Sequence, residues 1–488
     1  MIASCEGGLR LQNLSVQAKT EREEDGRLHV GKLRTPVLAR EGGFMKGINS
    51  KIRTVWGASE IGFSIAATLE TAFFLFFLTD VAQLPLAISG FIAAGASAVD
   101  TVSALVAGVF IDKFHFKRGK YRPWLIVAPT AAMVFFVLSF TKIGGDLTAG
   151  IIIGVGYIIS HFFWNVTYAS IRSMTNVLTD DPAERAFLSG RLGAGAALGR
   201  VAASKLVPWI TAALTAIVSG VGAYTACAAI VSLLYIAAMA VCFWATKGYD
   251  TESKSEGKKV SLVAMGKNIV SNPNLIGVVL HDILRLIAYY TVAAGTAYYA
   301  KVVLGDAAAS GTGLMMFYLG CFVGSFIAAR VAKVVGTKNA TLIGVGGWLV
   351  LWAVAYFLSP GYILLNVLLF CSQVFFGFAY GLSANLYSMC ATWSHWKTGE
   401  NTMSIMTVAV KLGVTLRAMI LPAFLALVSY DATATVFDAA AQAGIVQMYF
   451  LLPLGLLIAS LIPLIFLFKI KDEDVAKMNE DINARTAA

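Results

Sequence analysis

The chain has 488 residues, of which 58% are hydrophobic and 14% charged, and its formal net charge is +10. Soluble domains average about 45–50% apolar and about 25% charged residues, so this composition excludes an ordinary soluble protein. The positive charge does not indicate nucleic-acid binding, because the basic residues gather in short loops between apolar stretches, where they set membrane topology. We therefore expect a multi-pass membrane protein with no nucleic-acid partner.

The apolar stretches fall into two groups. Residues 1–45 are polar and lack the apolar segment of a secretory signal, so we expect a disordered cytoplasmic tail, with Met45 as an alternative start. About twelve apolar stretches follow, each close to the length that a membrane helix needs. The predicted order is an N-terminal six-helix bundle over 46–246, a central cytoplasmic loop over 247–273, a C-terminal six-helix bundle over 274–468 and a cytoplasmic tail over 469–488.

A strongly basic loop separates the second and third of these stretches. It runs from Asp112 to Trp124 and reads DKFHFKRGKYRPW. Loops rich in lysine and arginine stay in the cytoplasm, and an even number of spans then puts both chain ends on the same side. The sequence thus predicts an all-α protein of the cell membrane with both termini in the cytoplasm.

Several ionisable side chains fall inside the apolar stretches, where such a group costs about 2.5–3.5 kcal/mol on insertion scales and normally faces a cavity or a partner. They are Glu60, Glu70, Asp100, His161, Arg172, Arg191, Arg200, Lys205, Asp282, Arg285, Lys411 and Arg417. Asp100 lies near the middle of its stretch, and Lys411 is also well inside its own. Each is a candidate for a cation-coupled function, and a structural ion pair is the alternative.

Other charges in this set have local explanations. Asp282 and Arg285 are three residues apart on one predicted helix, so we expect them to pair. Arg200 and Lys205 flank a place where the predicted helix is expected to end, which would let Lys205 snorkel. His161 is interpreted as an interior histidine with a satisfied ring.

These charges favour transport over the other functions of membrane proteins. A transporter keeps a few charges in a central cavity that opens alternately to each side. A membrane enzyme needs a nucleophile with its base or a set of metal ligands, yet the chain has five histidines and no HExxH motif. No pore signature of a channel is present. We expect no catalysis, no metal site and no cofactor other than a coupling ion.

Several motifs, in their order and spacing, resemble the glycoside–pentoside–hexuronide:cation symporter family of the major facilitator superfamily, to which melibiose permease belongs. They are FFLFFLTDVAQL, Asp100, GKYRPW at Gly119 to Trp124, TDDPAERAFLSGR at Thr179 to Arg191, YYAKVVLGD at Tyr298 to Asp306, and HWKTGE followed by VKLG around Lys411. The resemblance covers about Val55 to Arg485. It implies two pseudo-symmetric six-helix halves, alternating access and symport of a sugar or sugar-like solute with H⁺ or Na⁺.

The resemblance also implies roles for particular residues. Asp100 would bind the cation with Ser103 and Asn165 as supporting oxygens, and Lys411 would couple the cation to the conformation. The residues expected to line the substrate site are Glu60, Ser64, Glu70, Trp164, Tyr168 and Arg172. The residues of the basic loop expected to latch the two halves in one state are Asp112, Lys120 and Arg122.

The chain departs from the family where the sugar is bound. Ser64 and Ala104 replace aspartates of the first two spans, and Tyr168 and Arg172 lie near the places of the span-four aspartate and tryptophan. The loss of carboxylates disfavours a neutral glycoside and weakens the case for Na⁺. A guanidinium forks onto a carboxylate or sulfonate, so Arg172 favours an anionic solute such as a hexuronide. Snorkelling of Arg172 to the helix end is the alternative.

Two further functions stay open at this point. One is a flippase or exporter of an amphipathic solute, such as a lysolipid or a drug-like molecule, because few cavity acids suit a less polar ligand. The other is a sensor that binds a solute without moving it. In either case we expect a small-molecule solute and the lipid bilayer as partners, and a monomer.

Overall fold

Long helices make up nearly all of the regular structure in the computed structural model. It describes residues 48–114, 116, 119–179, 181–250, 271–358, 361–398, 405–434 and 436–487, and no β-strand occurs in these ranges. The predicted disordered tail over 1–45 lies outside the described residues, and so does most of the predicted central loop over 247–273.

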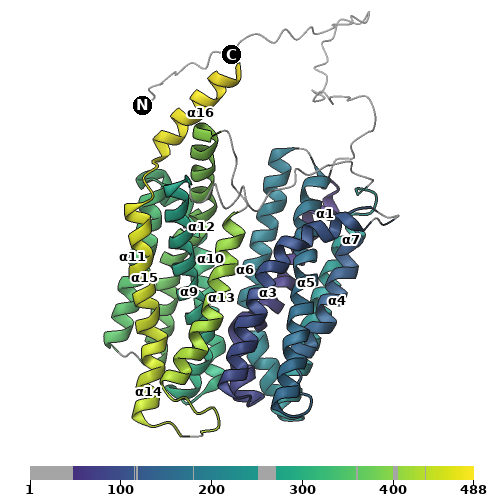
Figure 1. Cartoon of the computed structure of the whole chain (residues 1–488), viewed down its shortest axis with the longest axis vertical. Helices are drawn as coiled ribbons and strands as arrows, with labels where there is room; N and C mark the ends of the chain where they lie inside the picture. The colour runs from purple at the N-terminus through teal and green to yellow at the C-terminus, as the bar shows by residue number, and fades with distance from the viewer. Residues whose placement is uncertain are drawn as a thin grey trace, which may run out of the picture. The chain divides into compact units, whose positions relative to one another are not determined.

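The helices follow one another with short connections (Figure 1). Before the central loop they are α1 Ser50–Val55, α2 Ala58–Phe76 with the π-helical η1 Phe77–Val81, α3 Leu86–Lys113, α4 Trp124–Ser139, α5 Asp146–Leu178, α6 Pro182–Thr215 and α7 Gly220–Ala245. After it they are α9 Pro273–Val302, η2 Ala307–Ala309, α10 Ser310–Val335, α11 Thr337–Leu358, α12 Tyr362–Thr398, α13 Ile405–Leu427, α14 Ala439–Val446, η3 Gln447–Leu451, α15 Leu452–Phe466 and α16 Asp472–Ala487.

Among the described residues, ten helical segments are long and apolar enough to cross a membrane. The α4 helix is apolar but has only 16 residues, and the 34-residue α6 is long enough but carries more glycine and charge. With these two, the described residues contain twelve long apolar helices, which agrees with the predicted number of spans. The all-α membrane fold that the sequence predicts is therefore confirmed.

Small residues allow close contacts between these helices. A Cβ on Gly199 of α6 would collide with the backbone oxygen of Ile61 on α2, and one on Gly324 of α10 would collide with that of Val374 on α12. Glycine at such positions lets two helix backbones approach, as membrane helices commonly require. The glycines of α6 and α10 thus serve packing.

Three pairs of long helices make most of the contacts between the part of the chain before the central loop and the part after it. The α3 helix packs against α13, α6 against α10, and α2 against α9. The ionisable residues inside the membrane segments lie largely on these six helices. The contacts between the two parts are therefore where charges from distant segments meet.

The α6 helix is longer than expected. The helix was expected to end near Arg200 and Lys205, but α6 continues to Thr215, and Lys205 donates to the hydroxyl of Thr312 on α10 at 2.5 Å. That expectation was wrong, because the small residues of this stretch pack within the bundle instead of ending the helix.

The predicted C-terminal tail over 469–488 is largely helical. Asp472 of α16 accepts bonds from the N–H and the hydroxyl of Thr337 at 2.8 and 2.6 Å. Arg485 donates to the backbone oxygen of Trp396 at 2.9 Å. These bonds attach α16 to the ends of α11 and α12.

Candidate functional site

Asp100 is at the centre of a polar network between three helices. Its carboxylate accepts a bond from the Lys411 ammonium of α13 at 2.5 Å and one from the Asn165 amide of α5 at 2.7 Å. The same amide group donates to the Ser103 hydroxyl at 2.9 Å, and its oxygen accepts from Lys411 at 3.0 Å. The structure therefore brings together all four residues predicted for cation binding and coupling.

The network is shielded from solvent but not closed. Asp100 is 6% exposed and Ser103 8%, whereas the Lys411 side chain is 22% exposed. A buried carboxylate is stable only with a compensating charge and hydrogen bonds, which Lys411 and Asn165 provide here. A cation that reached Asp100 from the Lys411 side would take over the role of the ammonium.

A second charged pair joins α2 to α5. Arg172 donates to Glu60 at 2.8 Å, and its guanidinium carbon lies 4.9 Å from the ring centre of Tyr168. The Arg172 side chain is 43% exposed, but that of Glu60 is only 5% exposed. The guanidinium that was predicted to anchor an anionic solute is thus already neutralised by a carboxylate of the protein.

Aromatic side chains continue this surface along α5. The ring of Phe63 lies 5.1 Å from that of Trp164 and 5.7 Å from that of Tyr168, both between ring centres. Trp164 is 5% exposed, and its indole N–H has no hydrogen-bond partner among the described residues. Tyr168, at 37% exposed, is the ring of this group that a sugar face could contact, whereas the Trp164 indole is buried in this conformation.

Two residues predicted for the same site lie elsewhere. Glu70 accepts a bond from the Tyr157 hydroxyl at 2.7 Å and lies 3.8 Å from the His161 ring nitrogen. It is ten residues from Glu60 on α2, about 15 Å along a helix. Ser64 is 1% exposed and faces the tight contact with Gly199 of α6. In this conformation Ser64 is inaccessible to a solute.

The basic loop is anchored to the end of α7. The N–H groups of Tyr121 and Arg122 both donate to the Asp250 carboxylate at 2.7 Å. The Arg122 guanidinium stacks on Phe243 at 3.9 Å and donates to its backbone oxygen at 3.1 Å. These bonds hold the loop against the first half of the chain. A latch between the two halves stays a prediction.

Asp112 and Lys120 pair within the loop at 2.8 Å. The hydrogen bond to Asp112 raises the pKa of Lys120 above its usual value. Both groups are partly exposed, so the pair contributes little to stability. It brings the two ends of the loop together, which is consistent with a defined loop conformation.

One charged cluster was not assigned a function from sequence. Lys301 of α9 lies 2.5 Å from the carboxylate of Asp80 in η1, and the Tyr430 hydroxyl donates to the same carboxylate oxygen at 2.5 Å. Beside them the hydroxyls of Thr79 and Tyr298 are 2.9 Å apart. The TDV and YYAKVVLGD motifs were recognised separately, and the structure shows that they meet.

The expected local pair of Asp282 and Arg285 is present. Their side chains are 2.5 Å apart, and Ser383 of α12 donates to the other carboxylate oxygen at 2.6 Å. Arg285 is 1% exposed. This pair connects α9 to α12 within the second half of the chain, so its role is structural.

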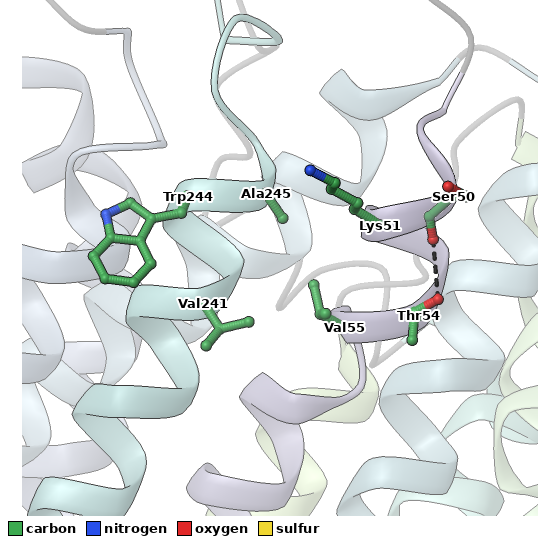
Figure 2. Close-up of a pocket in the computed structure, with 7 residues that line it drawn as sticks. All are labelled: Ser50, Lys51, Thr54, Val55, Val241, Trp244 and Ala245. Atoms are coloured by element: carbon green, nitrogen blue, oxygen red, sulfur yellow. Dashed lines mark hydrogen bonds between the residues drawn. The ribbon is translucent and has the colours of Figure 1, made fainter.

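A pocket of about 480 Å³ lies between α1 and the end of α7, away from these charges. Figure 2 shows its lining, with the amine of Lys51 and the indole of Trp244 at its rim; the residues are Ser50, Lys51, Thr54, Val55, Val241, Trp244 and Ala245. None of the residues predicted to bind solute or cation is among them. We therefore place the candidate site at the intramembrane charges and not at this pocket.

The fold and the charges at the helix contacts define a multi-pass membrane transporter. Comparison with known proteins identifies its family. The family described as MFS/sugar transport protein matches residues 55–472, so the chain belongs to this family of transporters. This agrees with the predicted resemblance.

Individual relatives are more distant. The chain is 25% identical over 451 residues to a putative sulfoquinovose importer of Escherichia coli K12, covering 90% of this chain and 94% of the relative. It is 22% identical over 451 residues to a putative 2,3-dihydroxypropane-1-sulfonate exporter of the same organism, covering 89% and 96%. A bacterial homologue of the human lysosomal transporter Spinster has a similar structure, with a TM-score of 0.60 at 13% identity over 88% of this chain and 97% of that one.

Proposed function

We propose that this protein is a symporter that couples the movement of a sugar-like solute to H⁺ or Na⁺ by alternating access. The observation that carries the proposal is the 2.5 Å contact between Asp100 of α3 and Lys411 of α13. The two residues are 311 positions apart in the sequence, and their helices belong to different halves of the chain. A cation that neutralised Asp100 would release Lys411 and thereby change a contact between the halves.

Competition between Lys411 and a cation for Asp100 would link cation binding to conformation. A ligand shifts a conformational equilibrium only when it binds one state better than the other. With Lys411 on Asp100 the site has no net charge, and the α3–α13 contact is held by that ion pair. With a cation on Asp100, Lys411 is free to move. The bound cation therefore favours states in which α3 and α13 are arranged differently.

The solute class is supported by the relatives and by the aromatic side chains of α2 and α5. One relative is described as a putative sulfoquinovose importer and the other as a putative 2,3-dihydroxypropane-1-sulfonate exporter. We therefore propose a polyhydroxylated solute, with an anionic one such as a hexuronide or sulfonated sugar as the favoured case. The direction of net transport would follow the gradients of cation and solute.

Transport into proteoliposomes tests this proposal. Purified protein would be assayed for uptake of labelled glucuronate, sulfoquinovose and glucose with an imposed H⁺ or Na⁺ gradient, and with a lysolipid as competitor. We expect accumulation that depends on one gradient, and loss of accumulation but retention of solute exchange in Asp100→Asn. Accumulation by that variant equal to wild type would contradict the proposal, and inhibition by the lysolipid alone would favour an amphipathic cargo.

Topology and assembly also belong to the proposal. We infer that both chain ends face the cytoplasm of the cell, since the basic loop at Asp112 to Trp124 favours retention on that side. A monomer remains our prediction for the assembly. Labelling of a cysteine introduced at exposed Lys51 in intact and opened cells would test the topology. Labelling in intact cells by an impermeant reagent would contradict it.

A further inference from the structure

Three arginines inside the predicted membrane stretches, Arg191, Arg200 and Arg417, have no carboxylate partner among the described residues, and Arg191 is exposed. Arg417 of α13 is 5% exposed, and its buried Nε has no hydrogen-bond partner among the described residues. Arg200 of α6 contacts only a neutral group, the Tyr380 hydroxyl of α12, at 3.4 and 3.5 Å. Within the described ranges, neither guanidinium lies within ion-pair distance of a carboxylate.

Three other intramembrane cations make a contrast, although Lys205 also donates only to a hydroxyl, that of Thr312. Arg172 pairs with Glu60, Arg285 with Asp282 and Lys411 with Asp100. A charge that is buried without a partner is costly, and inside membrane proteins such charges usually mark a ligand path. These three cations are each neutralised by a carboxylate of the chain, whereas buried Arg417 and half-buried Arg200 have no carboxylate contact among the described residues.

The two arginines lie on helices that meet at the contact between the halves. Arg200 is on α6, which packs against α10, Arg417 is on α13, which packs against α9, and α9 and α10 also contact each other. Arg200 also lies with its guanidinium carbon 5.8 Å from the ring centre of Tyr380. Cationic forks beside phenol hydroxyls offer donors to an oxyanion and to sugar hydroxyls together.

The buried carboxylates of α2 are held by other partners. Glu70 contacts the Tyr157 hydroxyl and the His161 ring, and Glu60 contacts Arg172. Neither carboxylate lies within ion-pair distance of Arg417 or Arg200.

We propose that Arg417 and Arg200 bind the carboxylate or sulfonate group of the solute, and that Arg172 does not. This rests on the proposed function as a carrier of sugar-like solutes and assigns its anion site. Because Arg417 and Lys411 are six residues apart on α13, about 9 Å along a helix, the solute and the coupling cation act on the same helix. Arg200 adds a contact from the first half of the chain, so the anion bridges both halves.

Thermal unfolding of the purified full-length protein tests the assignment. The probes are glucuronate, sulfoquinovose and neutral glucose, because a ligand that binds only the folded state raises the unfolding midpoint. The variants are Arg417→Met, Arg417→Lys and Arg200→Gln, and Arg330→Gln at an exposed position of α10 is the matched control. Apparent affinities come from the midpoint as a function of probe concentration.

We expect Arg417→Met to raise the midpoint without ligand, because it removes an unpaired buried charge. The same variant should lose affinity for both anionic probes by about tenfold or more, since a charge-assisted bond is lost. Arg200→Gln should lose affinity likewise, and Arg417→Lys should fall between, since lysine keeps the charge but not the planar fork. The control should bind like wild type, and affinity for glucose should stay within about twofold in every variant.

Unchanged anion affinity in Arg417→Met and Arg200→Gln would overturn the assignment, and so would failure of both anionic probes to stabilise the wild type. Should Arg417→Met fail to fold, the affinity of Arg417→Lys decides. Cation-driven uptake separates this result from the proposed function. If uptake depends on Asp100 but anion binding ignores both arginines, only the anion site is wrong. If the arginines bind the anion but no cation gradient drives uptake, only the coupling is wrong.

Discussion

The ammonium of Lys301 lies 2.5 Å from the carboxylate of Asp80, although 221 residues separate them. The Asp80 side chain is 2% exposed, and Lys301 also donates to the backbone oxygen of Ala432 at 2.9 Å. The contact joins the end of the first membrane segment to the ends of α9 and α13. It therefore closes the two halves against each other at the helix ends near α14 (Figure 1).

Breaking this contact should slow transport. Asp80→Asn and Lys301→Ala should each lower the initial uptake rate by about tenfold or more, since losing one partner of a charged hydrogen bond costs about 1.5–3 kcal/mol. The exchanged pair Asp80→Lys with Lys301→Asp should regain part of the rate. Uptake into proteoliposomes gives the measurement.

The control for this contact is Asp146→Asn. It breaks the exposed pair with Lys142, which joins neighbouring segments of the first half, so the rate should stay within about twofold. An exchanged pair no faster than either single variant would show that the Asp80–Lys301 attraction does not set the rate.

Arg172 should behave as a structural partner of Glu60. Arg172→Gln leaves a carboxylate that is 5% exposed without its cation, which should cost about 1–3 kcal/mol and lower the unfolding midpoint. The double variant Glu60→Gln/Arg172→Gln should recover most of that loss. A double variant less stable than Arg172→Gln, measured by thermal unfolding, would contradict the pairing.

Gly119 should not tolerate a side chain. Its φ is +111°, and a Cβ there would fall on the backbone oxygen and carboxylate of Asp250. Gly119→Ala should therefore cost about 1–3 kcal/mol from backbone strain alone, and it should detach the basic loop from α7. The unfolding midpoint checks this result. Gly145→Ala, with open space and an ordinary φ of −72°, should stay close to wild type, and an equal loss in both would reject the explanation.

The sequence predicts the helices well because each needs only a long apolar run, and it marks Asp100 and Lys411 because a charge inside such a run is costly. The resemblance adds that these two lie near each other. The number of spans follows even for α4 and α6, since length and small residues compensate for weaker hydrophobicity.

The partners of the charges were harder to predict. The sequence indicates no partner for Arg172. Only the structure shows that Glu60, 112 residues away on α2, neutralises it. Arg417 reads as one more charge near Lys411, and its lack of a partner appears only when every neighbouring helix is in place. Periodicity shows which residues share a face of one helix but not which face of another helix they meet.

Binding of the coupling cation to the purified protein tests the central claim most directly. The unfolding midpoint of wild type, Asp100→Asn and Lys411→Met would be followed against NaCl, with choline chloride holding the ionic strength, and against pH. We expect a cation-dependent rise in wild type, none in Asp100→Asn, and a rise at about 5–150-fold lower cation concentration in Lys411→Met, because its competing ammonium is gone. An Asp100→Asn variant that responds to the cation as wild type does would place the coupling site elsewhere and contradict the account.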